Sequence, residues 1–204
     1  MQLTKLILKN KAINLLVVIV LFFGNAVHAQ SSEAQWLHNI NPSQTHIQFW
    51  INTSKSVYPL ALAAPASLLA AGFIKKDKEL QKKGWQLCSA LIVNTVITQG
   101  LKYGINRNRP YQDYPAYIIP YQYDNDPSFP SGHTSTAFAT ATSLSLAYKK
   151  WYVIVPSFTW ATAVGYSRLS LGEHYASDVF AGAAVGIGSA YLSHWLNKKL
   201  FTKK

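Results

Sequence analysis

Five long apolar segments constrain the fold of this chain more than any other feature. They span residues 57–74, 86–103, 132–148, 151–167 and 176–196. None shows the alternation of apolar and polar residues that is typical of a β-strand, and all are longer than ordinary strands. The sequence therefore predicts an all-α fold, a helical bundle in which five or six helices span a membrane.

The positions of the basic residues predict how these helices are threaded. The formal net charge is +11, and most lysines gather in clusters that separate alternate apolar segments. The clusters are Lys5, Lys9 and Lys11; Lys75, Lys76, Lys78, Lys82 and Lys83; Lys149 and Lys150; and Lys198, Lys199, Lys203 and Lys204. Threading the segments alternately through a bilayer puts all four clusters on one side, which is the cytoplasmic side by the positive-inside rule. The connections at 30–56, 104–130 and 167–175 then face outward.

A strongly basic chain could instead bind nucleic acid. Such a protein is expected to carry basic residues interleaved with aromatic residues on one surface, together with arginine-rich contacts. This chain has only three arginines, Arg107, Arg109 and Arg168. We expect no nucleic-acid partner, and no protein partner is evident.

Three polar clusters stand at the outward ends of the apolar segments. They are KYGINRNRP at 102–110, PSGH at 130–133 and SRLSLGEHYASD at 167–178. Together they supply fixed cations, two histidines, a carboxylate and a turn that starts a helix. Cations and free N–H groups at a helix start both bind phosphate oxygens, so the clusters predict a phosphate site.

The spacings K-x6-RP, PSGH and SR-x5-H-x3-D resemble, in the same order, the signature of the type 2 phosphatidic acid phosphatase and haloperoxidase superfamily. The resemblance runs from Lys102 to Asp178. It implies a phosphatase that needs no cofactor and no metal ion. Vanadate-dependent haloperoxidases share the signature but are typically much longer, so the resemblance favours the phosphatases.

The expected catalytic residues are His174, His133 and Asp178. Asp178 follows His174 by four residues, so on a helix the two would share a face and could hydrogen-bond, which fixes the imidazole tautomer. His174 is then the nucleophile that forms a phosphohistidine. His133 is expected to protonate the departing alkoxide.

The expected phosphate-binding residues are Lys102, Arg109, Ser131, Gly132 and Arg168. The three cations would hold the phosphoryl oxygens. Ser131 would offer its hydroxyl, and the backbone N–H groups of Ser131, Gly132 and His133 would be free to point at the anion. Arg107 and Glu173 lie outside the signature, and we assign them no role.

The predicted organisation has three parts. Residues 1–29 have a basic start, an apolar stretch and a small-residue end, so they are a signal peptide or a first transmembrane helix. Residues 30–56 form an outward-facing N-terminal segment, and 57–204 form the helical catalytic domain. Within it, Gly182 and Gly186 in a GxxxG arrangement predict close helix packing.

The expected substrate is a phospholipid or isoprenoid phosphate, a phosphomonoester or pyrophosphate, because the site lies at headgroup level. Membrane lipids are the other expected partners, and the predicted location is a bacterial inner membrane with the site facing the periplasm. The Tyr- and Pro-rich stretch 111–127 is either an aromatic rim around the site or an interfacial anchor.

Two alternatives remain open. The low mean hydropathy of +0.04 also suits a soluble periplasmic non-specific acid phosphatase. A catalytically inactive phospholipid-binding or transport membrane protein is the alternative of another class.

Overall fold

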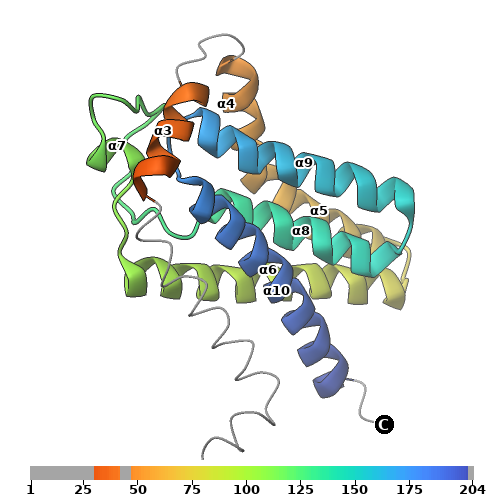
Figure 1. Ribbon diagram of the computed structural model, residues 1–204. Coiled ribbons are helices and arrows are strands. Elements are labelled where there is room, and N and C mark those ends of the chain that lie inside the picture. Colours follow the sequence, from red (N-terminus) through yellow and green to blue (C-terminus); the bar gives the residue numbers. More distant parts are fainter. Residues whose placement is uncertain (1–29, 42–46, 202–204) are drawn as a thin grey trace, which may run out of the picture.

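All regular secondary structure in the described part of the chain is helical (Figure 1). The computed structural model describes residues 30–41 and 47–201, and the predicted signal peptide or first helix lies outside these ranges. The helices, labelled as in Figure 1, are α3 (Gln30–Ile40), α4 (Ile47–Lys55), α5 (Val57–Ile74), α6 (Lys78–Ile105), α7 (Pro110–Asp113), α8 (Gly132–Tyr148), α9 (Trp151–Ser170) and α10 (Ala176–Phe201). The all-α prediction is confirmed.

The five apolar segments correspond to α5, α6, α8, α9 and α10. Helix α6 is longer than the segment 86–103 because Asp77 caps an earlier start: its carboxylate accepts hydrogen bonds from the N–H groups of Glu79 at 2.9 Å and Leu80 at 3.1 Å. At its other end α6 stops at Asn106, which adopts the left-handed conformation with φ 51°. Lys102 therefore lies in the last turn of α6.

The lysine-rich turns lie together at one end of the bundle. The Lys83 Nζ atom, near the α5–α6 turn, lies 4.5 Å from the centre of the Tyr148 ring, next to the α8–α9 turn. The two turns are therefore close together. In Figure 1 both turns lie on the right, opposite α3 and α7 on the left. This is the up-and-down arrangement that the lysine clusters predict.

The outer surface of the bundle is strongly apolar. By length and composition, two helical stretches in the described residues could cross a membrane: Ile47–Ile74, with mean hydropathy 1.8, and Ala176–Lys199, with 1.2. Large side chains on several helices face outward, among them Leu62 (67% exposed), Val96 (67%) and Phe180 (75%). Exposed apolar side chains on several helices suit contact with lipid. Five or six membrane-spanning helices were expected, and those other than these two remain a prediction.

The segment 30–56, expected only as an outward-facing segment, contains α3 and α4. Helix α3 is fixed to the site end of the bundle by Leu37, which is fully buried against Tyr111, Ile118 and Leu169. The Asn41 side chain adds hydrogen bonds to the backbone of Ile119, donating to its oxygen at 2.8 Å and accepting from its N–H at 2.8 Å. Helix α3 is thus part of the folded unit.

Gly182 and Gly186 let α10 pack directly on the backbone of α8, as the GxxxG arrangement predicts. A Cβ atom on Gly186 would overlap the Ser135 carbonyl oxygen and lie 2.8 Å from the Ala139 nitrogen. One on Gly182 would lie 2.6 Å from the Ser131 oxygen. This approach also brings the start of α8 to the start of α10, where the Ser131 N–H donates to the Asp178 carbonyl at 3.0 Å.

We predict that Gly186→Ala destabilises the protein by about 1 to 3 kcal/mol, the usual cost of overpacking. Thermal unfolding in detergent measures the effect. Gly188→Ala, on the same helix, is the matched control, because a Cβ atom at residue 188 would have no neighbouring atom within 4 Å. Equal melting temperatures for the two variants would contradict the close packing.

Candidate active site

The three polar clusters of the sequence meet at the end of the bundle opposite the lysine-rich turns. The charges of Arg109, Arg168 and Lys102 and the ring of His133 all act on His174. Lys102, Arg109, Arg168 and His174 are each no more than 3% exposed. They come from the end of α6, the start of α7, the end of α9 and the turn before α10. Five of the expected residues therefore lie within electrostatic reach of one another at this end of the bundle.

Each of the three cations lies beside carboxylates that do not belong to the signature. Lys102 Nζ lies 2.8 Å from Asp126, and Arg109 lies 2.5 Å from Asp126 and 3.1 Å from Asp124. Both aspartates belong to the 111–127 stretch, which thus reaches the site. A buried cation is tolerated only with such neutralising partners.

Arg168 is the least satisfied of the three cations. Its nearest carboxylate oxygens belong to Glu173 at 3.7 Å and Asp124 at 3.8 Å, beyond hydrogen-bond distance. Among the described residues its buried Nε and Nη2 atoms have no hydrogen-bond partner, while Nη1 donates to Ser54 at 2.7 Å. Arg168 therefore keeps N–H donors for an anion with several oxygens.

Glu173, to which the sequence analysis gave no role, is fully buried between Arg109 and Arg168. Its Oε2 atom is 3.3 Å from Arg109, and its Oε1 atom accepts from the Gln122 N–H at 2.9 Å. Burial raises the pKa of Glu173 to about 7, against the opposing effect of Arg168. Near neutral pH this carboxyl group therefore changes between a charged and a neutral form.

Asp126 stays ionised near neutral pH. Burial acts to raise its pKa, but the hydrogen bond and charge of Lys102 and the charge of Arg109 outweigh this and lower the pKa to about 2. Asp126 is a permanent counter-ion, whereas Glu173 is a titratable one.

His174 was expected on a helix, but it lies in the turn before α10. Its Nδ1 atom is still near Asp178, 3.6 Å from Oδ2, but this exceeds a direct hydrogen bond. Ser128 completes the connection: its hydroxyl donates to Asp178 Oδ2 at 2.6 Å and lies 3.3 Å from His174 Nδ1. The same Oδ2 atom accepts the Tyr175 N–H at 2.9 Å, so Asp178 also caps the start of α10.

His174 is a neutral imidazole at neutral pH. Burial lowers its pKa well below the usual value, and the charges of Arg109, Arg168 and Lys102 lower it further. A neutral imidazole keeps a nitrogen lone pair, which nucleophilic attack requires.

The start of α8 differs in part from the expectation. The Ser131 hydroxyl accepts from the Thr134 N–H at 3.4 Å and contacts the Thr134 hydroxyl at 2.9 Å, while the Ser131 N–H is used by Asp178. Ser131 therefore caps α8. Its N–H was expected to be free, but it is bonded to the Asp178 carbonyl. Gly132 and His133 occupy the first helical positions, whose N–H groups have no acceptor within the helix.

Gly132 and His133 both face the cationic group. A Cβ atom on Gly132 would lie 3.8 Å from Lys102 Cε, so the backbone here is close to that cation. The charges of Arg168, Arg109 and Lys102 act on His133, whose ring packs edge-on against Tyr58 at 5.0 Å between centres.

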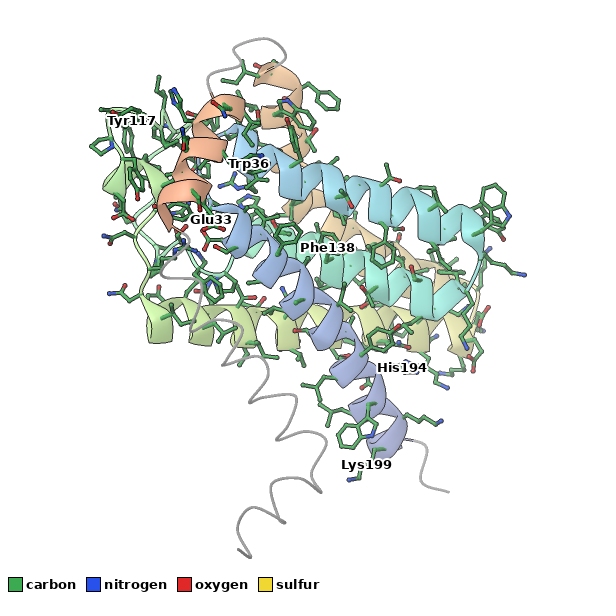
Figure 2. The ribbon with its side chains drawn as sticks, viewed as in Figure 1. Glu33, Trp36, Tyr117, Phe138, His194 and Lys199 are labelled. Carbon is green, nitrogen blue, oxygen red and sulfur yellow. The ribbon has the colours of Figure 1, made fainter. Side chains whose placement is uncertain are left out.

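Two further residues support this region. Arg107 contacts Asp178, and Glu33 of α3 contacts Arg107. Figure 2 shows Glu33 beside the start of α10. Ser128 and Glu33 carried no signal in the sequence, whereas Arg107 and Glu173 lay inside the polar clusters. Within residues 30–41 and 47–201, no three His, Cys, Asp or Glu side chains gather as metal ligands.

The chain is similar to several known proteins. A family model described as the PAP2 superfamily matches residues 83–201. The lipid A 1-phosphatase of Porphyromonas gingivalis is 46% identical over 77 residues, covering 36% of this chain and 17% of that protein. The undecaprenyl-diphosphatase of Sulfolobus acidocaldarius is 32% identical over 117 residues, covering 57% and 56%. The chain thus spans less than two thirds of the length of these relatives.

The fold also matches a solved structure. The crystal structure of a transmembrane PAP2-type phosphatidylglycerolphosphate phosphatase from Bacillus subtilis superposes with a TM-score of 0.70 at 21% identity. The match covers 92% of this chain and 98% of that one.

We predict that anion binding depends on the protonation of Glu173. Sulfate keeps a constant charge near neutral pH, so it is a suitable probe. Its affinity should rise as the pH falls through about 7, because protonated Glu173 no longer neutralises Arg109 and Arg168. Glu173→Gln should bind sulfate tightly on both sides of this pH.

Titration calorimetry in detergent measures these affinities. Glu79→Gln, an exposed carboxylate at the lysine-rich end, is the matched control and should keep the wild-type pH dependence. A wild-type affinity that does not change through this pH range would show that Glu173 does not control the cations.

Proposed function

The chain belongs to the PAP2 superfamily, and from this membership we propose that it is a membrane phosphatase that hydrolyses a lipid phosphomonoester or pyrophosphate through a phosphohistidine intermediate. The observation that carries the proposal is the burial of His174 beside buried cations: the residue before it, Glu173, accepts from Arg109 at 3.1 Å through its carbonyl and donates its N–H to the Arg168 carbonyl at 3.1 Å. A nucleophile surrounded by buried cations suits the transfer of a phosphoryl group, whose equatorial oxygens carry the charge.

The proposed first step is attack by a His174 nitrogen on phosphorus. The N–P bond forms as the bond from phosphorus to the leaving oxygen breaks, and the imidazolium form of His133 gives its proton to that oxygen. Ser128 and Asp178 lie at Nδ1, so Nε2 is the attacking atom. Lys102, Arg109 and Arg168 hold the phosphoryl oxygens, together with the N–H groups of Gly132 and His133.

The proposed second step is hydrolysis of the phosphohistidine. A water molecule gives one proton to His133 as its oxygen attacks phosphorus, and the N–P bond breaks. Inorganic phosphate leaves and His174 is neutral again. His133 is thus the acid of the first step and the base of the second.

Lipid phosphates are the proposed substrate class. The apolar outer surface and the two long apolar helical stretches support a membrane location, which puts the site at the ends of the helices near lipid headgroups. The names of the two relatives, a lipid A phosphatase and an undecaprenyl-diphosphatase, support the same class. Both a phospholipid phosphate and an isoprenoid phosphate suit the proposal, because the proposed site residues would bind only the phosphate that the two share.

The proposed location is a bacterial inner membrane with the site facing the periplasm. The lysine-rich turns lie at the opposite end of the bundle, which supports a cytoplasmic position for them. A soluble periplasmic acid phosphatase is less well supported, because its exposed apolar side chains would face water. An inactive lipid-binding or transport protein would have no need of a neutral, buried His174.

We predict that His174→Ala lowers the rate of phosphate release at least about 10³-fold, because the nucleophile is lost. The assay uses purified protein with a panel of lipid and soluble phosphates, with and without EDTA. His194→Ala is the control: this histidine bonds Gln86 at 2.7 Å, away from the site (Figure 2).

The intermediate can be tested directly. A quenched reaction should contain acid-labile, alkali-stable phosphate on the wild type and the His194→Ala variant, and none on His174→Ala. Full hydrolysis by His174→Ala would remove the proposed nucleophile, and inhibition by EDTA would contradict a metal-independent reaction.

We predict that the two ends of the bundle are labelled from opposite sides of the membrane. In a Cys88→Ala background, Tyr117→Cys should react with an impermeant maleimide added to intact spheroplasts, and Lys150→Cys only after lysis. Both positions are exposed. The reverse pattern would place the site in the cytoplasm, and labelling of both together with release into the soluble fraction would favour the soluble alternative.

A further inference from the structure

We infer that Arg107 is a positioning residue for the nucleophile and that Glu33 of α3 holds Arg107 in place. The inference rests on the proposed function, because it concerns how His174 is oriented for attack. Arg107 lies outside the spaced signature residues, and Glu33 lies outside residues 83–201 that the family model matches.

Arg107 fixes the start of α10 through three contacts. Its Nη1 atom donates to Asp178 Oδ1 at 2.8 Å and to the Ser177 hydroxyl at 2.7 Å. The guanidinium carbon lies 4.0 Å from the centre of the Tyr175 ring. A planar guanidinium with two hydrogen bonds and a stacked ring has little freedom to move. Its partners are the residues that immediately follow His174.

The two oxygens of Asp178 have separate partners. Oδ1 accepts from Arg107, whereas Oδ2 accepts from the Ser128 hydroxyl at 2.6 Å and the Tyr175 N–H at 2.9 Å. Asp178 is fully buried. With Oδ1 held by Arg107, the carboxylate plane is fixed and Oδ2 stays beside Ser128 and His174 Nδ1. The connection therefore runs from Arg107 through Asp178 and Ser128 to the imidazole.

Glu33 ties this connection to α3. Its Oε1 atom accepts from the Ser177 N–H at 2.9 Å, and its Oε2 atom accepts from the Ser177 hydroxyl at 2.9 Å and from Arg107 Nη2 at 3.2 Å. A carboxylate at the start of α10 also has a favourable interaction with the helix dipole. Helix α3 thus supports the nucleophile without contacting it.

The role of Arg107 differs from that of the phosphate-binding cations. Its charge is already shared by Glu33 and Asp178, with side-chain exposures of 16% and 0%. Arg168, in contrast, has buried nitrogen atoms without hydrogen-bond partners in the described structure. Loss of Arg107 should therefore affect the chemical step, and loss of Arg168 the binding of the anion.

The test compares Arg107→Ala, Arg107→Lys and Arg168→Ala by kinetics and by sulfate titration. Arg107→Ala should lower kcat about 10- to 100-fold, as is typical when a supporting contact of a functional histidine is lost, with KM and sulfate affinity within about twofold of wild type. Arg107→Lys should recover part of kcat, because it keeps the charge but not the two-pronged geometry. Arg168→Ala should weaken sulfate binding.

Glu33→Gln covers the case in which Arg107→Ala does not fold. It keeps an oxygen that can accept the Ser177 N–H but replaces the Oε2 acceptor of Arg107 and the Ser177 hydroxyl by an NH2 donor, so kcat should fall about 2- to 10-fold with unchanged sulfate affinity. Glu79→Gln is again the control and should have wild-type kcat.

The outcomes separate the two proposals. Wild-type protein without phosphatase activity would end the proposed function. An active wild type with inactive His174→Ala, but with undiminished kcat in Arg107→Ala or Glu33→Gln, would overturn the positioning role alone. Parallel losses of kcat and sulfate affinity would assign Arg107 to phosphate binding instead.

Discussion

The burial of three cations at one end of a helical bundle is the constraint on which the rest of this structure depends. Lys102, Arg109 and Arg168 are nearly inaccessible to solvent, and unpaired charges in such a position would be strongly destabilising. The chain meets this demand with Asp124, Asp126 and Glu173, which come from two connections between helices. The loops at this end are therefore held in place by the same charges that form the site.

The packing of α10 on α8 sets the position of the two histidines of the candidate site. Gly182 and Gly186 allow the two helix backbones to touch, so that the first turns of both helices begin side by side. The hydrogen bond from the Ser131 N–H to the Asp178 carbonyl joins those turns. His133 and His174, although far apart in the sequence, thus depend on one helix contact for their relative position.

Much of the helical fold could be predicted from the sequence, because helix formation and the direction of each helix depend on residues within or next to that helix. The apolar segments give the starts of α5, α8, α9 and α10, and the lysine clusters give the alternating direction. The spaced polar residues predict that Lys102, Arg109, Arg168, His133 and His174 come together. Their catalytic roles remain proposals.

The partners of these residues could not be predicted, because they depend on how distant segments meet. His174 precedes α10 since Asp178 caps that helix, and only the closed fold shows Ser128 between the two. The acids Asp124, Asp126 and Glu33 lie in segments without any recognisable spacing. Glu173 and Arg107 lay within the polar clusters, outside the signature residues. Their ion pairs follow from tertiary contacts that no local pattern encodes.

The carboxylates around the cations have a consequence for turnover. In the proposed reaction, the substrate phosphate takes over guanidinium and ammonium groups that Asp126 and Asp124 already neutralise, so its entry is an exchange of counter-ions. When inorganic phosphate leaves, the aspartates can return to the same cations. Lys102 and Arg109 then have counter-ions both with and without the phosphate, so a strongly cationic site can release a dianion instead of retaining it.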